Sequence, residues 1–427
     1  MMIEDGKMLR TELAYSLPDF ALPYKAFLLV SFLMGLLFSM EFIVFFFIKT
    51  KNLHSVFSKF SMLFNKNRKI IGFVLAIWLG IFAFTLRWHA LNILDVEVDE
   101  KFYLPASMHY ANAIKNRDWN DVIHYDFNIE HPVFTKLIYA ISILVTRSVN
   151  DFQGSLIASR VVSALFTVGN VILISFVNPI AGFFLAVNSW SIMYSSVAYL
   201  DSSTAFFATL AVLAFNRSKS KLNKYLIISA IATGMGFASK YSFMAIPAAL
   251  SLILLWKSLK QNFAFTSLKP LVCYGAVSIF TFFLCDPILW TNTGERLILS
   301  LFFHPTHWES PWVTEANLPI YHQFVWLSTS NPWHAQKFIF HWDAFVLFLG
   351  LLGFPFLYKR NKIYGAWYLA TASFLFFYPV KWPQYTLIFI PPLTLAIGEL
   401  IRFNVKAVYE RLKPRFHEEV ATHAKEN

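Results

Sequence analysis

Residues 225–256 read YLIISAIATGMGFASKYSFMAIPAALSLILLW, and Lys240 is the single charged residue in this stretch. A helix that crosses a bilayer needs about 20 predominantly apolar residues. The run therefore predicts two rather short membrane helices, 225–239 and 241–256, which meet at the lysine. Basic segments flank the run at both ends, so we expect the pair to enter and leave the membrane on one side, with Lys240 at the other.

The composition of the whole chain agrees with a membrane protein. Of its 427 residues, 57% are hydrophobic, 18% are aromatic and only 14% are charged, whereas a soluble domain has about 25% charged residues. So many aromatic side chains exclude a disordered chain. The net charge of +11 lies between long apolar runs, so we predict no nucleic-acid partner. Cys273 and Cys285 lie about three helical turns apart, which suits neither a disulfide nor a CxxC metal site.

Further apolar runs extend this interpretation to the whole chain. We predict an all-α polytopic membrane bundle of about 11–13 spans, with several of them in the almost continuously apolar region 133–215. Within that region, 133–148 either crosses the membrane or re-enters it. The other candidate spans are 26–48, 70–91, 270–290, 341–357, 363–378 and 385–401. The first follows a polar lead, and no small-residue cleavage site comes after its apolar run, so we expect a retained span rather than a signal peptide.

The basic residues indicate the orientation. Sixteen of the 36 lysines and arginines lie in four segments without acidic residues, namely 49–69, 216–224, 257–269 and 359–362. Cytoplasmic loops carry such an excess of positive charge, so these segments are predicted to be cytoplasmic. The segments 92–132, 291–340 and 379–384 then face the outer or luminal side.

This topology predicts five parts of the chain. They are an extra N-terminal span with its basic loop (1–69), a catalytic membrane module (70–290) that includes the first outer loop (92–132), a second outer loop (291–340), the C-terminal spans (341–401) and a charged, partly helical cytoplasmic tail (402–427).

The first outer loop opens with four carboxylates, Asp95, Glu97, Asp99 and Glu100. Neighbouring carboxylates at a membrane surface repel each other and lose solvation, which can raise a pKa and produce a general base. A solvated acidic loop is the simpler alternative. The stretch 102–119 that follows has helical periodicity and predicts an amphipathic helix on the membrane surface.

Three more charged sites face the same side. Glu130 and His131 precede an apolar segment that contains Lys136, and a charge inside a membrane usually marks a site or a pathway. Asp201 either caps a helix or belongs to that site. Lys240 either extends to the interface or holds an anion, and we favour the anion.

The second outer loop supplies Arg296 and several histidines and tryptophans. His304 and His307 have helical spacing but no third ligand nearby, so we predict no metal site. The tryptophans suit an interfacial aromatic belt, although tryptophan also stacks on sugars.

A carboxylate base and several cations at a membrane surface suit transfer from a lipid-linked phosphosugar. The cation neutralises the phosphate leaving group, and the carboxylate takes the proton of the incoming hydroxyl. A proton-coupled transporter also keeps such groups in the membrane. Transporters commonly have internal repeats, and this sequence contains none.

Several motifs, in order, resemble those of the protein O-mannosyltransferases, which are C-type glycosyltransferases. They are Val98-Asp99-Glu100, His131-Pro132 with Lys136, Arg160 within Ser159–Phe166, Tyr199-Leu200-Asp201-Ser202 and Gly236–Tyr241. The resemblance covers roughly residues 70–300.

This resemblance implies an inverting transfer of mannose, or another hexose, from a dolichyl or polyprenyl phosphate to a protein Ser/Thr hydroxyl. It implies that Asp99 is the catalytic base and that Glu100 helps to position the acceptor. The residues implied to bind the donor phosphate or substrate are Lys240, Arg296, His131, Asp201, Glu130, Arg160 and Lys136. The expected partners are the donor, the acceptor and the bilayer, and a divalent cation stays open as a cofactor. The protein would lie in a prokaryotic plasma membrane or in the endoplasmic reticulum.

Some residues depart from that family. Val133 replaces a second proline, and 291–340 is too short for the β-trefoil domain of the eukaryotic members. The run Lys381–Tyr385 followed by Pro391-Pro392 looks more like prokaryotic relatives, including the lipid A aminoarabinose transferases. The acceptor could therefore be a lipid or a glycan instead of a protein.

Overall fold

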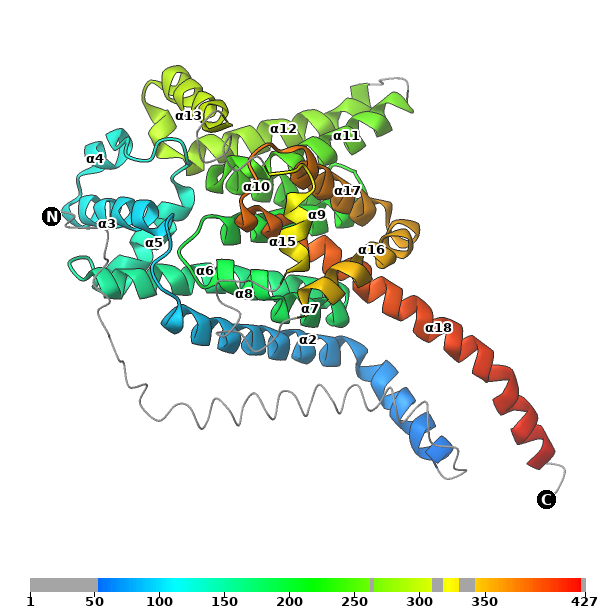
Figure 1. Ribbon diagram of the computed structural model, residues 1–427. Helices are drawn as coiled ribbons and strands as arrows, with labels where there is room; N and C mark the ends of the chain where they lie inside the picture. Colours follow the sequence, from blue (N-terminus) through cyan, green and yellow to red (C-terminus); the bar gives the residue numbers. More distant parts are fainter. Residues whose placement is uncertain (1–52, 262–264, 309–317, 330–341, 424–427) are drawn as a thin grey trace. The chain divides into compact units, whose positions relative to one another are not determined.

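The computed structural model describes residues 53–261, 265–308, 318–329 and 342–423. The chain divides into two compact units, 1–67 and 68–427, and the second holds the features described below, apart from the helical residues 53–67. Every regular element in the described residues is a helix (Figure 1), which confirms the all-α prediction. The predicted span 26–48 lies outside the described residues.

The helices follow one another along the chain with short connections. They are α2 (Leu53–Ile93), α3 (Glu100–Asn116), α4 (Trp119–His124), α5 (Phe134–Val145), α6 (Phe152–Val177), α7 (Pro179–Val187), α8 (Ser189–Ser195), α9 (Asp201–Ser218), α10 (Lys224–Ser239), η1 (Tyr241–Met244), α11 (Ala245–Leu259), α12 (Phe265–Cys285), η2 (Pro287–Trp290), α13 (Thr293–Trp308), α15 (His322–Ser328), α16 (Asp343–Arg360), α17 (Lys362–Phe377), η3 (Pro383–Ile388) and α18 (Ile390–His423).

Three stretches within these helices are long and apolar enough to cross a membrane, namely Ile70–Ile93, Phe152–Val177 and Thr266–Cys285. They support an integral membrane protein, and the predicted total of about 11–13 spans stays a prediction. Only 11% of the apolar window in Thr266–Cys285 is buried. That helix therefore presents most of its surface to its surroundings.

Within the apolar region 133–215, asparagine caps separate α6, α7 and α8. The side chain of Asn178 accepts hydrogen bonds from the backbone N–H groups of Ile180 and Ala181, and Pro179 occupies the first turn of α7. Asn188 caps α8 in the same way. Helix α5 has 12 residues, which corresponds to about 18 Å, whereas the hydrocarbon core is about 30 Å thick. Helix α5 is therefore too short to cross that core by itself.

Small residues let the helices approach each other closely. A Cβ atom added at Gly353 of α16 would lie 2.2 Å from the carbonyl oxygen of Ala396 in α18. One added at Gly234 of α10 would lie 2.5 Å from the carbonyl oxygen of Ser278 in α12. Such close backbone contacts are typical of helix packing in membranes, where burial of apolar surface contributes little to association.

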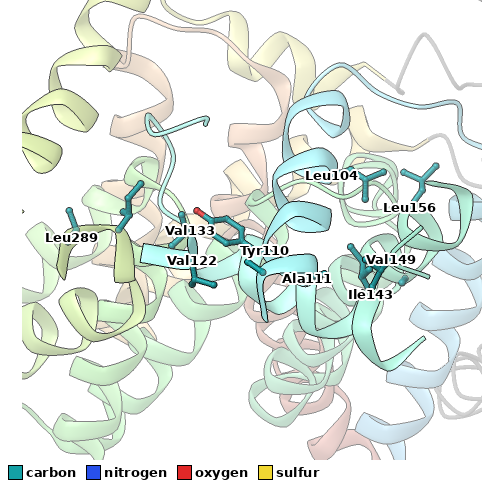
Figure 2. Close-up of a cluster of buried hydrophobic side chains, with 13 residues drawn as sticks. Leu104, Tyr110, Ala111, Val122, Val133, Ile143, Val149, Leu156 and Leu289 are labelled. Carbon is teal, nitrogen blue, oxygen red and sulfur yellow. The ribbon is translucent and has the colours of Figure 1, made fainter. Parts of the chain in front are cut away.

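The segment that carries Asp99 rests on a hydrophobic cluster of its own. Figure 2 shows this cluster, in which Leu104, Tyr110 and Ala111 of α3 are buried with residues of α4, α5, α6 and η2. The predicted amphipathic helix 102–119 is divided in two, because Arg117 adopts a left-handed backbone conformation that ends α3 before α4 begins. The cluster holds the N-terminus of α3, and so Asp99, against the bundle.

One boundary differs from the prediction. Helix α2 already begins at Leu53, so the segment 49–69 that we predicted as a loop is largely helical. Residues 53–69 contain neither glycine nor proline, so nothing in them interrupts a helix.

Candidate active site

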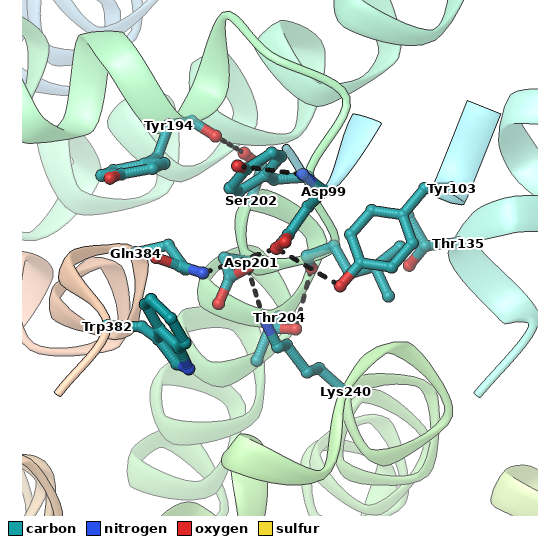
Figure 3. A network of polar contacts seen from close by, with 12 residues as sticks. Asp99, Tyr103, Thr135, Tyr194, Asp201, Ser202, Thr204, Lys240, Trp382 and Gln384 are labelled. Atoms are coloured by element: carbon teal, nitrogen blue, oxygen red, sulfur yellow. Dashed lines mark hydrogen bonds and ion pairs between the residues drawn. The ribbon is translucent and has the colours of Figure 1, made fainter. Parts of the chain in front are cut away.

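Asp99 lies at the start of α3, and its contacts come from α3 itself, from the loop before α9 and from η3 (Figure 3). Its backbone N–H donates to the Tyr199 hydroxyl at 3.3 Å. Its Oδ2 accepts from the Tyr103 hydroxyl at 3.5 Å and from Gln384 Nε2 at 3.4 Å. Burial is the main cause that raises the pKa of Asp99 from 3.8 to about 6; Lys240 opposes this rise and Asp201 adds to it. A carboxyl group with such a pKa can accept a proton near neutral pH.

Beside Asp99 lies a buried ion pair. Lys240 Nζ is 2.7 Å from Asp201 Oδ2, and both side chains are almost completely enclosed. Asp201 begins α9, and Lys240 occupies an extended position between α10 and η1, as expected for the junction of two short membrane helices. The lysine also lies 5.0 Å from the ring centroid of Tyr385, a distance typical of a cation–π contact.

Glu100 and Arg160 form a second buried pair next to the first. The Arg160 guanidinium donates to both carboxylate oxygens of Glu100, at 2.8 and 2.6 Å. It also donates to the carbonyls of Leu91, Leu94 and Asp95, at 2.7–2.8 Å. The resemblance implied that Arg160 binds the donor phosphate or substrate. In the structure Arg160 comes from α6 and bonds Glu100, the residue that follows Asp99. The pair thereby holds the backbone on both sides of Asp99 against α6.

His131 joins this group through aromatic contacts, whereas Lys136 holds a loop. The His131 ring packs edge-on against Tyr103 with 5.5 Å between centroids, and Tyr103 in turn contacts Asp99. The ammonium of Lys136 donates to the backbone carbonyls of Asn128 and His131 and to the Asn128 side chain. Glu130 accepts a short hydrogen bond from the same Asn128 side chain.

Arg296 lies at another place in the fold. Its guanidinium donates to the carbonyls of Ile123 and Ile288, at 2.8 and 3.1 Å, and more weakly to that of His124. It thereby joins α13 to α4 and η2. No contact among the described residues connects Arg296 with Asp99, Asp201 or Lys240.

The described residues contain no group of three or more His, Cys, Asp and Glu side chains placed to hold a metal ion. The side chains of His304 and His307 lie outside the part of the chain whose side chains are described.

The residues that sequence reasoning missed come mainly from the C-terminal part. Gln384 and Tyr385 belong to η3 and reach Asp99 and Lys240. We singled out their run for the cation of Lys381, but Lys381 bonds the carbonyls of Leu375 and Phe376 at the end of α17. The aromatic and amide residues that follow Lys381 carried no separate signal.

The helical arrangement is similar to that of a solved oligosaccharyltransferase. The chain is similar to the oligosaccharyltransferase of Archaeoglobus fulgidus in a structure tethered with an acceptor peptide that contains the NVT sequon: 13% identity, TM-score 0.53, covering 81% of this chain and 51% of that one. A structure of the same enzyme in complex with Zn and sulfate matches with 16% identity and a TM-score of 0.51, again covering 81% and 51%.

ArnT from Cupriavidus metallidurans, bound to undecaprenyl phosphate, matches with 15% identity and a TM-score of 0.49, covering 79% of this chain and 60% of that one. The match to the oligosaccharyltransferase covers 51% of that enzyme, so this chain spans about half of its length. No family model matches the chain, and no curated protein matches it.

Proposed function

We propose that this protein is a membrane glycosyltransferase that moves a sugar from a polyprenyl phosphate to an acceptor hydroxyl, with Asp99 as the general base. The observation that carries the proposal is the environment of Asp99. Its half-buried carboxyl group has a pKa of about 6 and lies beside a buried lysine. The shared fold with an oligosaccharyltransferase supports the same class of reaction.

In the proposed reaction the acceptor oxygen attacks the anomeric carbon of the donor. Asp99 accepts the proton of that hydroxyl as the new C–O bond forms. The bond between the anomeric carbon and the phosphate oxygen breaks, and its electron pair leaves with the polyprenyl phosphate. Attack from the side opposite the leaving group inverts the configuration of the anomeric carbon.

Lys240 would stabilise the charge that develops on the phosphate. A lysine ammonium has three N–H donors, and one of them bonds Asp201. A second donor could therefore bond a phosphate oxygen while Asp201 holds the lysine in place. Fixed donors near a developing charge lower the barrier, because they need no reorganisation during the reaction.

Glu100 and Arg160 would act through Asp99 rather than on the substrate. The backbone N–H groups of Glu97 and Ala198 donate to the Glu100 carboxylate, which also accepts both bonds from Arg160. With four hydrogen bonds already made, this carboxylate has little room to bond the hydroxyl of an acceptor substrate. We propose that the pair positions the segment 95–99, and hence the base.

The finer assignments follow from the motifs. The resemblance to protein O-mannosyltransferases favours mannose as the sugar and a protein Ser/Thr hydroxyl as the acceptor, on the outer or luminal face. The run Lys381–Tyr385 favours the alternative of a lipid or glycan acceptor, because it looks like that of the aminoarabinose transferases. The two hypotheses about the acceptor share the donor class and Asp99 as the base.

The test uses membranes that contain the full chain and a radiolabelled mannosyl polyprenyl phosphate. Wild-type membranes should transfer label to an acceptor, and Asp99→Asn membranes with equal amounts of folded protein should not. The exposed Asp126 of the same loop offers a matched control, since Asp126→Asn removes an equal charge. Unchanged transfer by Asp99→Asn would exclude Asp99 as the base. Extraction of labelled lipid apart from labelled protein distinguishes the acceptors.

A further inference from the structure

A basic cavity lies at the end of the helices remote from the candidate active site. It has a volume of about 300 Å³, and its lining includes Lys221, Lys257 and Lys269. These lysines come from the turn between α9 and α10, the end of α11 and the beginning of α12. Asp201 begins α9 and Lys240 follows α10, so the turn that joins these helices lies at their opposite ends. An 18-residue helix such as α9 is about 27 Å long.

Hydrogen bonds between the three elements hold this cavity in place. Lys257 Nζ donates to the carbonyls of Lys219 and Ser220, each at 3.1 Å, and so joins α11 to the α9–α10 turn. The Ser258 hydroxyl donates to the carbonyl of Ser267 at 2.7 Å and joins α11 to α12. The lysine cluster is therefore part of a fixed arrangement rather than a set of independent surface side chains.

The charged residues that line the cavity are all lysines. None of the residues that line it is acidic, and the sequence contains no aspartate or glutamate between Asp201 and Asp286. Lys221 and Lys269 are both exposed. Lys257 donates two of its three N–H groups to carbonyls of the α9–α10 turn, and the third N–H can bond a ligand. The natural ligand of such a cavity is an anion.

An apolar surface continues from Lys269, at the cavity, along α12. Val272, Ile279 and Phe280 of α12 lie on the same side of that helix as Lys269 and are 66%, 69% and 65% exposed. Trp256 of α11, one turn before Lys260, is 62% exposed. Tryptophan beside lysine at the end of an apolar helix is typical of the membrane interface. A ligand with a negative headgroup and long hydrocarbon chains would match both the lysines and this surface.

We propose that this cavity binds the phosphate headgroup of an anionic glycerophospholipid, whose acyl chains lie against the exposed face of α12. Basic pockets between membrane helices bind anionic lipid headgroups in this way. The site would lie in the leaflet opposite the candidate active site, and it does not depend on the proposed transfer reaction. Its ligand would be a constituent of the bilayer, distinct from the sugar donor.

The test is lipid binding to the full chain in detergent, measured by native mass spectrometry. Phosphatidylglycerol should bind, phosphatidylcholine should bind at least about tenfold more weakly, and inorganic phosphate should not compete at millimolar concentration. The variant Lys221→Gln with Lys269→Gln should lose about tenfold or more in affinity for phosphatidylglycerol. The charge-conserving pair Lys221→Arg with Lys269→Arg should retain it.

A matched control removes the same charge outside the cavity. Lys224 and Lys260 are exposed and do not line it, so Lys224→Gln with Lys260→Gln should change the affinity by less than about twofold. An equal loss in this control would mean attraction by net charge alone and would overturn the site. Equal binding of the two phospholipids, or displacement by inorganic phosphate, would overturn the lipid assignment.

Discussion

Asp99→Asn should make the protein more stable while it abolishes transfer. The carboxyl has a pKa of about 6 in the folded protein against an ordinary value of 3.8. Between these values the folded state binds more protons than the unfolded state, so stability falls as the pH rises through this window. A difference of about two units corresponds to about 3 kcal/mol at pH 7. Since Asp99 is only half-buried, we expect a gain of about 1–3 kcal/mol from the neutral asparagine.

The pH dependence of this gain is the specific signature. At pH 4 the Asp99 carboxyl is already protonated in the folded protein, so the asparagine should give almost no advantage there. The free energy of unfolding can be measured at pH 4 and pH 7 by reversible chemical denaturation in detergent micelles, followed by tryptophan fluorescence. The exposed control Asp126→Asn should change it by no more than about 0.5 kcal/mol at either pH.

Two results would refute the reasoning. A loss of stability in Asp99→Asn at pH 7 would mean that the ionised carboxyl contributes favourably to the fold. A gain of equal size at pH 4 and pH 7 would mean that packing or hydrogen bonding, and not the buried charge, is responsible.

Three further predictions concern neighbouring residues. The transfer rate should rise with pH through about 6 as Asp99 loses its proton, and in Lys240→Met this rise should move to higher pH, because the lysine lowers the pKa of Asp99; a pH–rate profile of both proteins checks it. Glu100→Gln should lower the free energy of unfolding by about 3–5 kcal/mol, because Arg160 would keep a buried charge without its anion; an unchanged denaturation midpoint would contradict this. Gly353→Val should cost about 1–3 kcal/mol by forcing α16 away from α18, which the same denaturation curves would detect, whereas an exposed substitution such as Lys224→Gln should not.

The helical composition of the protein and several helix boundaries could be predicted from the sequence. The length of an apolar run determines whether a helix can cross a bilayer, and this property does not depend on tertiary contacts. The position of Lys240 between two short helices followed from the same reasoning. The asparagine caps that separate α6, α7 and α8 were missed, because the apolar signal is continuous there and a cap acts through one side chain.

The sequence by itself determined that this chain is a helical membrane protein with acidic and basic residues at the ends of its helices. Only the tertiary structure decided which of these charges meet. It paired Glu100 with Arg160, 60 residues away, and placed Gln384 beside Asp99, 285 residues away. It also places Arg296 away from this group, where the guanidinium donates to carbonyls of α4 and η2. Hydropathy is a property of neighbours along the chain, whereas a hydrogen bond or an ion pair requires two groups within about 3 Å in space, and helix packing alone determines that distance.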